Sequence, residues 1–156
     1  MTPRIEYQKA APDALRAMYA VQGYVKASGL EHALLELVKI RASQINKCAY
    51  CLDMHTKDAR AAGETEQRLH VLNAWREAPF YTPRERAALE WTEAVTEIAA
   101  SAVPDDLFKR TRDHFSEKEL VDLTMAVIAI NGWNRLAIAF RSDVGSYKSP
   151  RAAGTT

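Results

Sequence analysis

Two cysteines, one histidine and one glutamate are the residues of this chain whose types and spacing indicate chemistry. Glu36, Cys48, Cys51 and His55 follow the pattern E-x11-C-x2-C-x3-H, and the chain has no other cysteine. If residues 48–62 form a helix, Cys48, Cys51 and His55 fall at i, i+3 and i+7 and share one face. The pattern therefore predicts a pocket lined by a dithiol and an imidazole.

The sequence around the cysteines favours a helix that activates one thiol. Good helix formers fill the second half of residues 48–62, and Gly63 is well placed to end the helix. We expect Asn46 to be the N-cap, which puts Cys48 in the first turn, where free amides and the helix dipole favour a thiolate. His55 lies one turn beyond Cys51 and can take its proton. These two arguments favour different cysteines, so physical reasoning leaves the nucleophile open.

Three kinds of chemistry are compatible with the cysteine pair. Two incidental buried thiols would leave the spacing to His55 unexplained. A structural zinc site needs four ligands, and this pattern offers three on one helix face. In redox catalysis a thiolate attacks a peroxide oxygen, becomes a sulfenic acid, and is resolved by the second cysteine as a disulfide. We favour redox catalysis, because a carboxylate and a histidine can supply the base and fix its tautomer.

Composition gives no sign of a nucleic-acid or membrane partner. The chain has 156 residues and a formal net charge of +1, with 21 basic and 20 acidic residues interspersed, so no broad basic field exists. The N-terminus has no apolar signal region, and the most apolar stretch, Leu120 to Ile130, is too short to span a bilayer and carries Asp122. We expect a soluble cytoplasmic protein.

The rest of the chain predicts helix after helix and no convincing strand. We expect one all-α domain of about six to seven helices over residues 1–144 and a flexible tail over residues 145–156. Pro12 opens the first helix, Thr82 with Glu85 and Ser116 with Glu119 form capping boxes, and Gly132 is a candidate point for a kink or a break. The expected helices cover residues 12–28, 31–45, 48–62, 65–75 and 82–101, and two more begin near residues 104 and 116.

Other polar and aromatic residues have simpler interpretations. Taken alone, Glu36 fits the solvated flank of an amphipathic helix. Only its occurrence in one motif with the two cysteines and His55 argues for a functional role. Three polar residues in the last helix could bridge to Glu36 or to a neighbouring helix, but we interpret them as satisfying a helix break: Asn131, Asn134 and Arg135. We expect the remaining histidines at the surface: His32, His70 and His114. We expect the tryptophans in the core or at interfaces: Trp75, Trp91 and Trp133.

Together these motifs resemble the alkylhydroperoxidase D (AhpD) core of the carboxymuconolactone decarboxylase superfamily. Besides the cysteine pattern, the likeness includes G-x-T at residues 63–65, L-E-W-T-E-A-V-T at residues 89–96 and I-N-x-W-N-R at residues 130–135, and it covers most of residues 30–142. It implies an all-helical AhpD-like bundle and a homo-oligomer. A hexamer is favoured over a trimer, because the chain is shorter than the two-part AhpD chain.

The resemblance also implies a thiol-dependent alkyl hydroperoxide reductase. It makes Cys51 the attacking thiolate and Cys48 the resolving partner, and it puts Glu36 and His55 on proton-relay positions. No cofactor motif is present, so electrons must come from a protein or small dithiol, of the lipoyl or thioredoxin type. AhpD carries a second histidine where this chain has Tyr50, which implies weaker activity, because a phenol is a poor base near neutral pH.

Two other functions remain open at this stage. The chain could be a redox sensor or disulfide exchange protein without significant peroxidase turnover. A lactone decarboxylase, as in the other branch of the superfamily, is disfavoured because that branch uses no cysteine pair.

Overall fold

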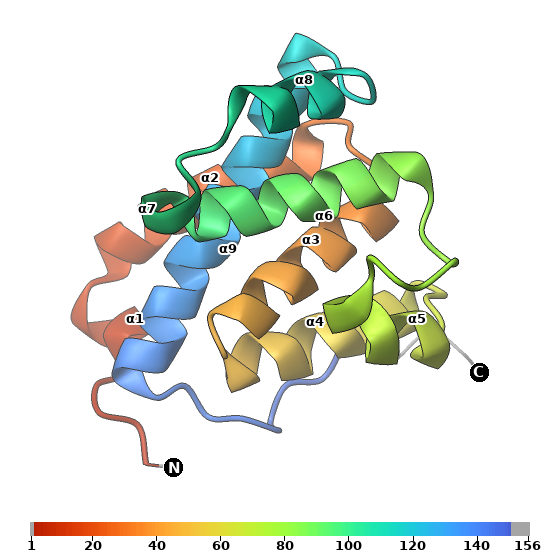
Figure 1. The fold of residues 1–156 in the computed structure, drawn as a ribbon. Coiled ribbons are helices and arrows are strands. Elements are labelled where there is room, and N and C mark those ends of the chain that lie inside the picture. The colour runs from red at the N-terminus through yellow and green to blue at the C-terminus, as the bar shows by residue number, and fades with distance from the viewer. Residues whose placement is uncertain (1, 151–156) are drawn as a thin grey trace.

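The computed structural model describes residues 2–150, and every regular element in that range is a helix (Figure 1). The elements are α1 (Tyr7–Ala10), α2 (Pro12–Ala27), α3 (His32–Ile45), α4 (Ala49–Ala61), α5 (Glu66–Val71), a 3-10 turn (Leu72–Ala74), α6 (Pro83–Thr96), α7 (Ile98–Ser101), α8 (Asp105–Arg112) and α9 (Glu117–Phe140). The predicted all-α class is confirmed. Each expected segment is helical, but the structure has more helices in the described residues than the six to seven expected, because the short α1 and a separate α7 were not predicted.

Local capping chemistry explains where the long helices begin. Pro12 occupies the first position of α2, and both predicted capping boxes, at Thr82 and Ser116, are formed. The helix predicted for residues 82–101 is divided, because Glu97 leaves the helical region with φ −102° and ψ 36°. α6 therefore ends at Thr96, and α7 follows as a separate turn.

α9 lies at the centre of the bundle, where it packs against α2, α3, α4, α6 and α8 (Figure 1). By length and composition its 24 residues could cross a membrane, a property that core helices share. Leu123 and Val127 are fully buried inside the bundle. Asp122 is also buried, accepting hydrogen bonds from Tyr24 (2.7 Å) and Lys118 (2.6 Å). α9 is longer than the apolar stretch expected from the sequence, and it serves as a core helix.

Gly132 does not interrupt α9, which is helical throughout. A Cβ atom at this position would lie 2.8 Å from Met18 Cε on α2. The glycine therefore leaves room for the end of the Met18 side chain, and it is not the helix break considered from the sequence.

α3 carries apolar residues into both main clusters of the core. Val38 packs with α9 residues such as Leu123, while Leu37 and Ile40 pack with Leu89 of α6. All three α3 residues are at most 1% exposed. Because α3 is held from two sides, the neighbouring Glu36 has a fixed position.

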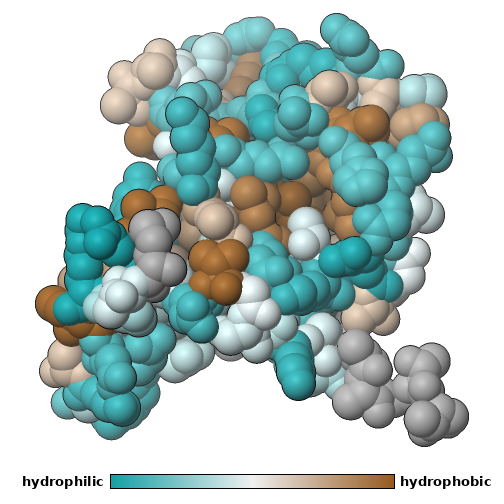
Figure 2. Space-filling model, turned by 90° about the horizontal axis from the view of Figure 1, so that it is seen from below, coloured by the Kyte–Doolittle hydropathy of each residue, from teal (hydrophilic) through white to brown (hydrophobic). Residues whose placement is uncertain are grey.

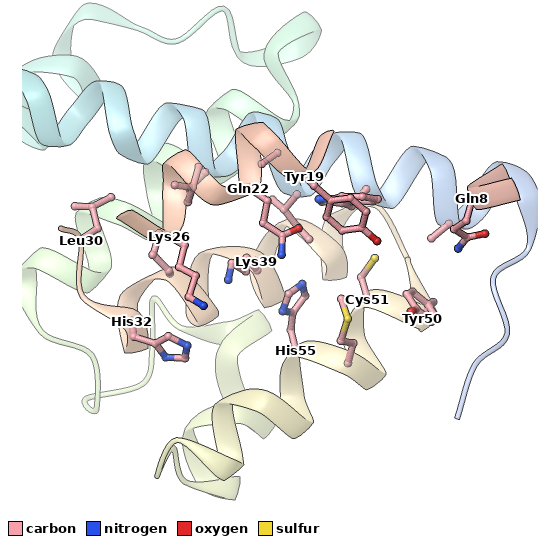
Figure 3. A pocket seen from close by; sticks show the side chains of 18 of the residues that line it. Gln8, Tyr19, Gln22, Lys26, Leu30, His32, Lys39, Tyr50, Cys51 and His55 are labelled. Carbon is pink, nitrogen blue, oxygen red and sulfur yellow. The ribbon is translucent and has the colours of Figure 1, made fainter. Parts of the chain in front are cut away.

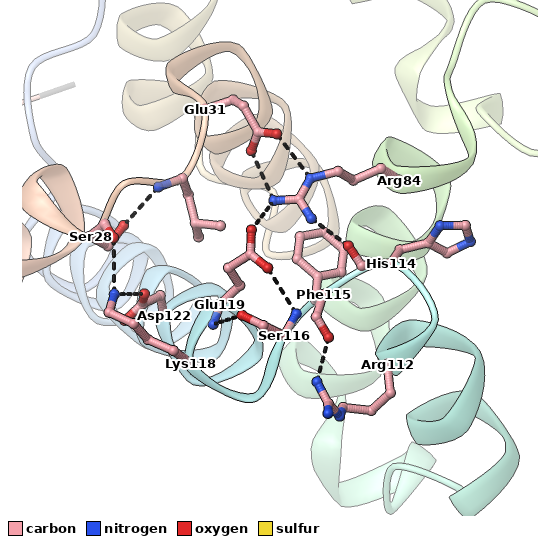
Figure 4. A network of polar contacts seen from close by, with 11 residues as sticks. Ser28, Glu31, Arg84, Arg112, His114, Phe115, Ser116, Lys118, Glu119 and Asp122 are labelled. Atoms are coloured by element: carbon pink, nitrogen blue, oxygen red, sulfur yellow. Dashed lines mark hydrogen bonds and ion pairs between the residues drawn. The ribbon is translucent and has the colours of Figure 1, made fainter.

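A polar network at one end of the bundle joins three helix starts (Figure 4). Arg84 of α6 pairs with Glu31, which precedes α3, at 2.9 Å and with Glu119 of α9 at 2.7 Å. Its guanidinium also lies over the ring of Phe115, 4.1 Å from the centroid. These partly exposed pairs fix the register of the three helices more than they add stability.

Residues 145–150 do not behave as the frayed segment predicted for residues 145–156. The hydroxyl of Tyr147 donates to both carboxylate oxygens of Asp58 on α4, at 2.9 and 3.0 Å, and Lys57 Nζ donates to the carbonyl of Tyr147 at 3.0 Å. Residues 151–156 lie outside the described residues.

Seen from below, the surface is largely hydrophilic, with hydrophobic side chains gathered toward the middle of this face (Figure 2).

Candidate active site

The turn between α3 and α4 places Cys48 at the N-cap of α4. The predicted N-cap, Asn46, instead follows the last turn of α3, and Lys47 adopts a left-handed conformation with φ 58°. Cys48 Sγ then accepts a hydrogen bond from the backbone amide of Cys51 at 3.4 Å. The prediction for Asn46 was wrong, but Cys48 still meets the free amides at the positive end of the helix.

The two cysteines form a hydrogen-bonded pair of free thiols. Their sulfurs are 2.8 Å apart, and both residues are buried. Cys48 comes from the cap of α4 and Cys51 from its first turn, as a C-x2-C spacing allows. A small side-chain movement is sufficient to bring the sulfurs to disulfide distance.

The pair loses its first proton readily and its second with difficulty. The pKa of Cys48 is lowered to about 7, mainly by its hydrogen bond with the Cys51 thiol. The backbone amide of Cys51 and the side chain of Asn134 also lower this pKa, whereas burial raises it. The pKa of Cys51 is raised, because its hydrogen bond to Cys48, burial and the Cys48 charge all retain its proton. One proton is therefore shared between the two sulfurs near neutral pH.

A thiolate titration should show this unequal ionisation. We expect absorbance at 240 nm to report one thiolate per chain with an apparent pKa of about 7 and the second only in strong alkali. The denatured protein is the control, in which both thiols should ionise near the ordinary value of about 8.5. Two thiols that titrate together at that value in the folded protein would contradict the pairing.

His55 and Glu36 form a second buried pair beside the thiols. His55 Nδ1 lies 3.0 Å from Glu36 Oε2, and Lys39 Nζ lies 2.8 Å from Glu36 Oε1. Glu36 is only 3% exposed, so it is not the solvated flank that its position alone suggested. A neutral His55 that donates its Nδ1 proton to Glu36 leaves Nε2 free to accept a proton.

Glu36 stays ionised despite its burial. Burial is the largest influence and raises its pKa, but the hydrogen bond and charge of His55, together with Lys39, outweigh it and lower the pKa to about 2. A carboxylate that is charged at neutral pH can hold the imidazole in one tautomer and stabilise its protonated form.

A pocket of about 270 Å³ opens next to these pairs (Figure 3). Cys51 and His55 line it, whereas Cys48 and Glu36 lie behind them. Apolar and aromatic side chains from α2, α3 and α9 form much of the remaining wall: Val25, Leu35, Ile130 and Trp133. Tyr50 stands beside Cys51 at the pocket, at the position where the AhpD pattern has its second histidine.

Sequence reasoning missed Asn134, which supports the thiols. It is fully buried, accepts a hydrogen bond from Asn46 Nδ2 at 2.9 Å and donates to Ser43 Oγ at 3.0 Å. It also hydrogen-bonds the cysteine pair and lowers the pKa of both thiols. The interpretation of Asn134 as part of a helix break was wrong. The sequence did contain a signal for a buried polar network, because Asn134 is a polar residue in a helix that is apolar on nearly every face.

Asn134→Leu should weaken both the fold and the thiolate. It removes the hydrogen bond that the buried Ser43 accepts and one of the two acceptors of Asn46 Nδ2, and the loss of a buried partner typically costs about 1–3 kcal/mol of unfolding free energy. It should also raise the pKa of Cys48 above about 7. Urea unfolding and thiolate titration measure the two effects, with the exposed Asn73→Leu as the matched control. An unchanged thiol pKa would remove Asn134 from the site.

His32 is also closer to the site than the sequence suggested. It lines the pocket, with a side chain that is 43% exposed and Nε2 3.7 Å from Glu36 Oε1. The i to i+4 spacing from His32 to Glu36 on α3 could have indicated this contact.

The described residues contain one group with possible metal ligands, formed by Glu36, His55 and Asp58. Lys39 already pairs with Glu36, and the Tyr147 hydroxyl already bonds Asp58. Both carboxylates therefore have hydrogen-bond donors, and we assign a polar network here.

Comparison of the sequence with known proteins identifies the family of this chain. The carboxymuconolactone decarboxylase family matches residues 12–94. The uncharacterized protein YdfG of Bacillus subtilis is 46% identical over 146 residues, which cover 94% of this chain and 99% of YdfG.

Solved structures share the fold. A crystal structure from Agrobacterium tumefaciens, of a protein of unknown function described as a candidate antioxidant defence protein AhpD, is 49% identical, with a TM-score of 0.90. The match covers 94% of this chain and all of that one. An AhpD-core, peroxidase-related protein of uncharacterized function from Ralstonia eutropha is 22% identical over 94% of this chain and 78% of that one. Its TM-score of 0.79 shows the shared fold.

Proposed function

This chain belongs to the carboxymuconolactone decarboxylase family, and we propose that within this family it is a thiol-dependent hydroperoxide reductase. Cys48 and Cys51 would cycle between dithiol and disulfide. The observation that carries the proposal is the pair of free sulfurs 2.8 Å apart, one of which lines a pocket together with the Glu36-bound His55.

The reaction begins when the Cys51 thiolate attacks the terminal oxygen of a hydroperoxide in the pocket. The O–O bond breaks, the alkoxide leaves with the bonding electrons, and protonation gives the alcohol, while Cys51 becomes a sulfenic acid. Cys48 then attacks the sulfenic sulfur, and the hydroxyl leaves with a proton as water, which forms the disulfide. A supplied dithiol returns two electrons and two protons.

The lining of the pocket supports Cys51 as the attacking cysteine. Cys48 has the lowered pKa, but Cys51 and not Cys48 lines the pocket. A proton moves between hydrogen-bonded sulfurs 2.8 Å apart much faster than a peroxide arrives, so the negative charge is available at either sulfur. The sulfur that lines the pocket, Cys51, is therefore the proposed nucleophile, and Cys48 behind it resolves the sulfenic acid.

His55 and Glu36 move and hold the proton in this proposal. His55 accepts the proton that the thiol pair loses and returns it to the leaving alkoxide. Glu36 stabilises the charged imidazole across the 3.0 Å hydrogen bond and remains ionised because its pKa is about 2.

Sustained turnover tests the proposed function. Purified protein, a hydroperoxide and an excess of dihydrolipoamide or thioredoxin should consume many peroxide molecules per chain without another cofactor. A redox sensor or disulfide exchange protein would consume about one equivalent and then stop. Release of carbon dioxide from a carboxylated lactone without peroxide consumption would instead support the decarboxylase alternative.

We also propose a cytoplasmic homo-oligomer, with a hexamer favoured over a trimer. In the described residues α2 and α9 expose apolar side chains that a second copy could cover, among them Tyr24, Val121 and Ile128. The proposed reductant is a protein or small dithiol of the lipoyl or thioredoxin type, and neither nucleic acid nor a membrane is a proposed partner.

A further inference from the structure

Cationic side chains, and no carboxylate among the described residues, line the pocket. Among the described residues that line it are two lysines, Lys26 and Lys39, and two histidines, His32 and His55, but no aspartate or glutamate. Glu36 lies behind the wall, where it pairs with Lys39 at 2.8 Å and with His55 at 3.0 Å. Lys26 is therefore the lysine of the pocket whose charge is available to attract an anionic occupant.

Lys26 is a pocket lysine whose charge has no partner among the described residues. It is exposed at the end of α2, and no ion pair or hydrogen bond reaches its ammonium group from the described residues. Lys39, by contrast, is 2.8 Å from Glu36. In Figure 3, Lys26, His32 and Lys39 lie toward one end of the pocket, and Tyr50 lies toward the other, beside Cys51.

The pocket also has an apolar wall. Leu35 of α3 and Ala126, Ala129 and Ile130 of α9 contribute to it. The cavity of about 270 Å³ is near the lower end of the sizes that hold small organic ligands. Hydrogen peroxide would use none of this apolar surface, whereas an alkyl chain would bury part of its own.

We propose that the preferred substrate is an organic hydroperoxide with an apolar body and a carboxylate at its far end. The hydroperoxide meets Cys51, the body lies on the apolar wall, and the carboxylate binds at Lys26. This inference rests on the proposed reductase function, and it assigns the substrate class to the same pocket.

A matched pair of probes tests the charge alone. ω-Hydroperoxydecanoic acid and its methyl ester have the same body and the same reacting group, and hydrogen peroxide has neither body nor charge. We expect kcat/KM for the acid to exceed that for the ester by about tenfold, with the difference shrinking in high salt. Lys26→Met should lower kcat/KM for the acid by roughly three- to fivefold, as expected for a partly exposed ion pair, and leave the ester and hydrogen peroxide unchanged.

Lys109→Met is the matched control, because it removes the same charge from an exposed site on α8 outside the pocket. It should change none of the three rates. Equal rates for acid and ester in wild type, or equal losses in the two lysine variants, would overturn the carboxylate assignment while peroxide turnover continued.

If no hydroperoxide is consumed, the proposed reductase function is wrong. Ligand binding can then still test whether the pocket prefers an anion. Decanoate and methyl decanoate can then be titrated into wild type and Lys26→Met by calorimetry. Tighter binding of decanoate that weakens in Lys26→Met would support the anion site without the chemistry. Equal binding of acid and ester would overturn it.

Discussion

Cys51→Ser should abolish peroxide turnover, with a loss on the order of a thousandfold or more. Serine is a poor nucleophile here because its hydroxyl stays protonated where a thiol ionises. The substitution is nearly isosteric at a buried position, so the fold should survive, and thermal unfolding checks this. Stopped-flow peroxide consumption with a supplied dithiol measures the loss.

Cys48→Ser is the matched partner and should fail at a different step. Its Cys51 should form a sulfenic acid once, detectable by dimedone labelling and mass, and then stop because no resolving thiol is available. A Cys48→Ser protein that forms no sulfenic acid, beside a Cys51→Ser protein that does, would reverse the two roles. Such a result would mean that the lowered pKa of Cys48 outweighs the access of Cys51 to the pocket.

Glu36→Gln should slow the peroxide step by about a hundredfold or more. Glutamine keeps the size of the side chain but removes the charge that stabilises a protonated His55 across the 3.0 Å contact. It also leaves Lys39 without its carboxylate. Single-turnover kinetics with hydrogen peroxide measure the effect. His32→Gln is the control, because His32 approaches the same carboxylate only to 3.7 Å and should change this rate little.

Acid unfolding separates the carboxylate of Glu36 from a purely structural role. The folded pKa of about 2 lies below the ordinary 4.5, so the stabilisation is present above pH 4.5 and is lost as pH falls toward 2. The full difference corresponds to about 3 kcal/mol of unfolding free energy. Glu36→Gln should lack this loss between pH 5 and 3. An unchanged peroxide rate together with this altered acid stability would leave Glu36 as a structural residue only.

The helical fold was largely predictable because its signals are local. The capping boxes at Thr82 and Ser116 depend on residues three apart, and both are formed. The proximity of Glu36 to His55 was suggested by the motif, and the distance of 3.0 Å agrees with it. The capping boxes repeat the same short-range chemistry in any surroundings, whereas the Glu36–His55 contact joins two helices and was expected from the motif as a whole.

The features that sequence reasoning missed depend on tertiary contacts. Cys48, and not Asn46, is the N-cap of α4, because the side-chain amide of Asn46 donates hydrogen bonds to Asn131 and Asn134 on α9. Tyr147 was assigned to a loose tail because its partner, Asp58, is far away in the sequence. Propensity cannot show which distant helix will satisfy a polar group.

Intact-mass analysis of the reduced wild-type protein during stoichiometric hydroperoxide addition tests the proposed peroxidase most directly. We expect loss of two hydrogens per chain at a rate well above that of a C-x2-C model peptide, reversed by dithiol and repeated over many rounds. Oxidation no faster than that of the peptide would contradict the proposed activity, because the paired thiols, His55 and Glu36 would then give the sulfur no advantage.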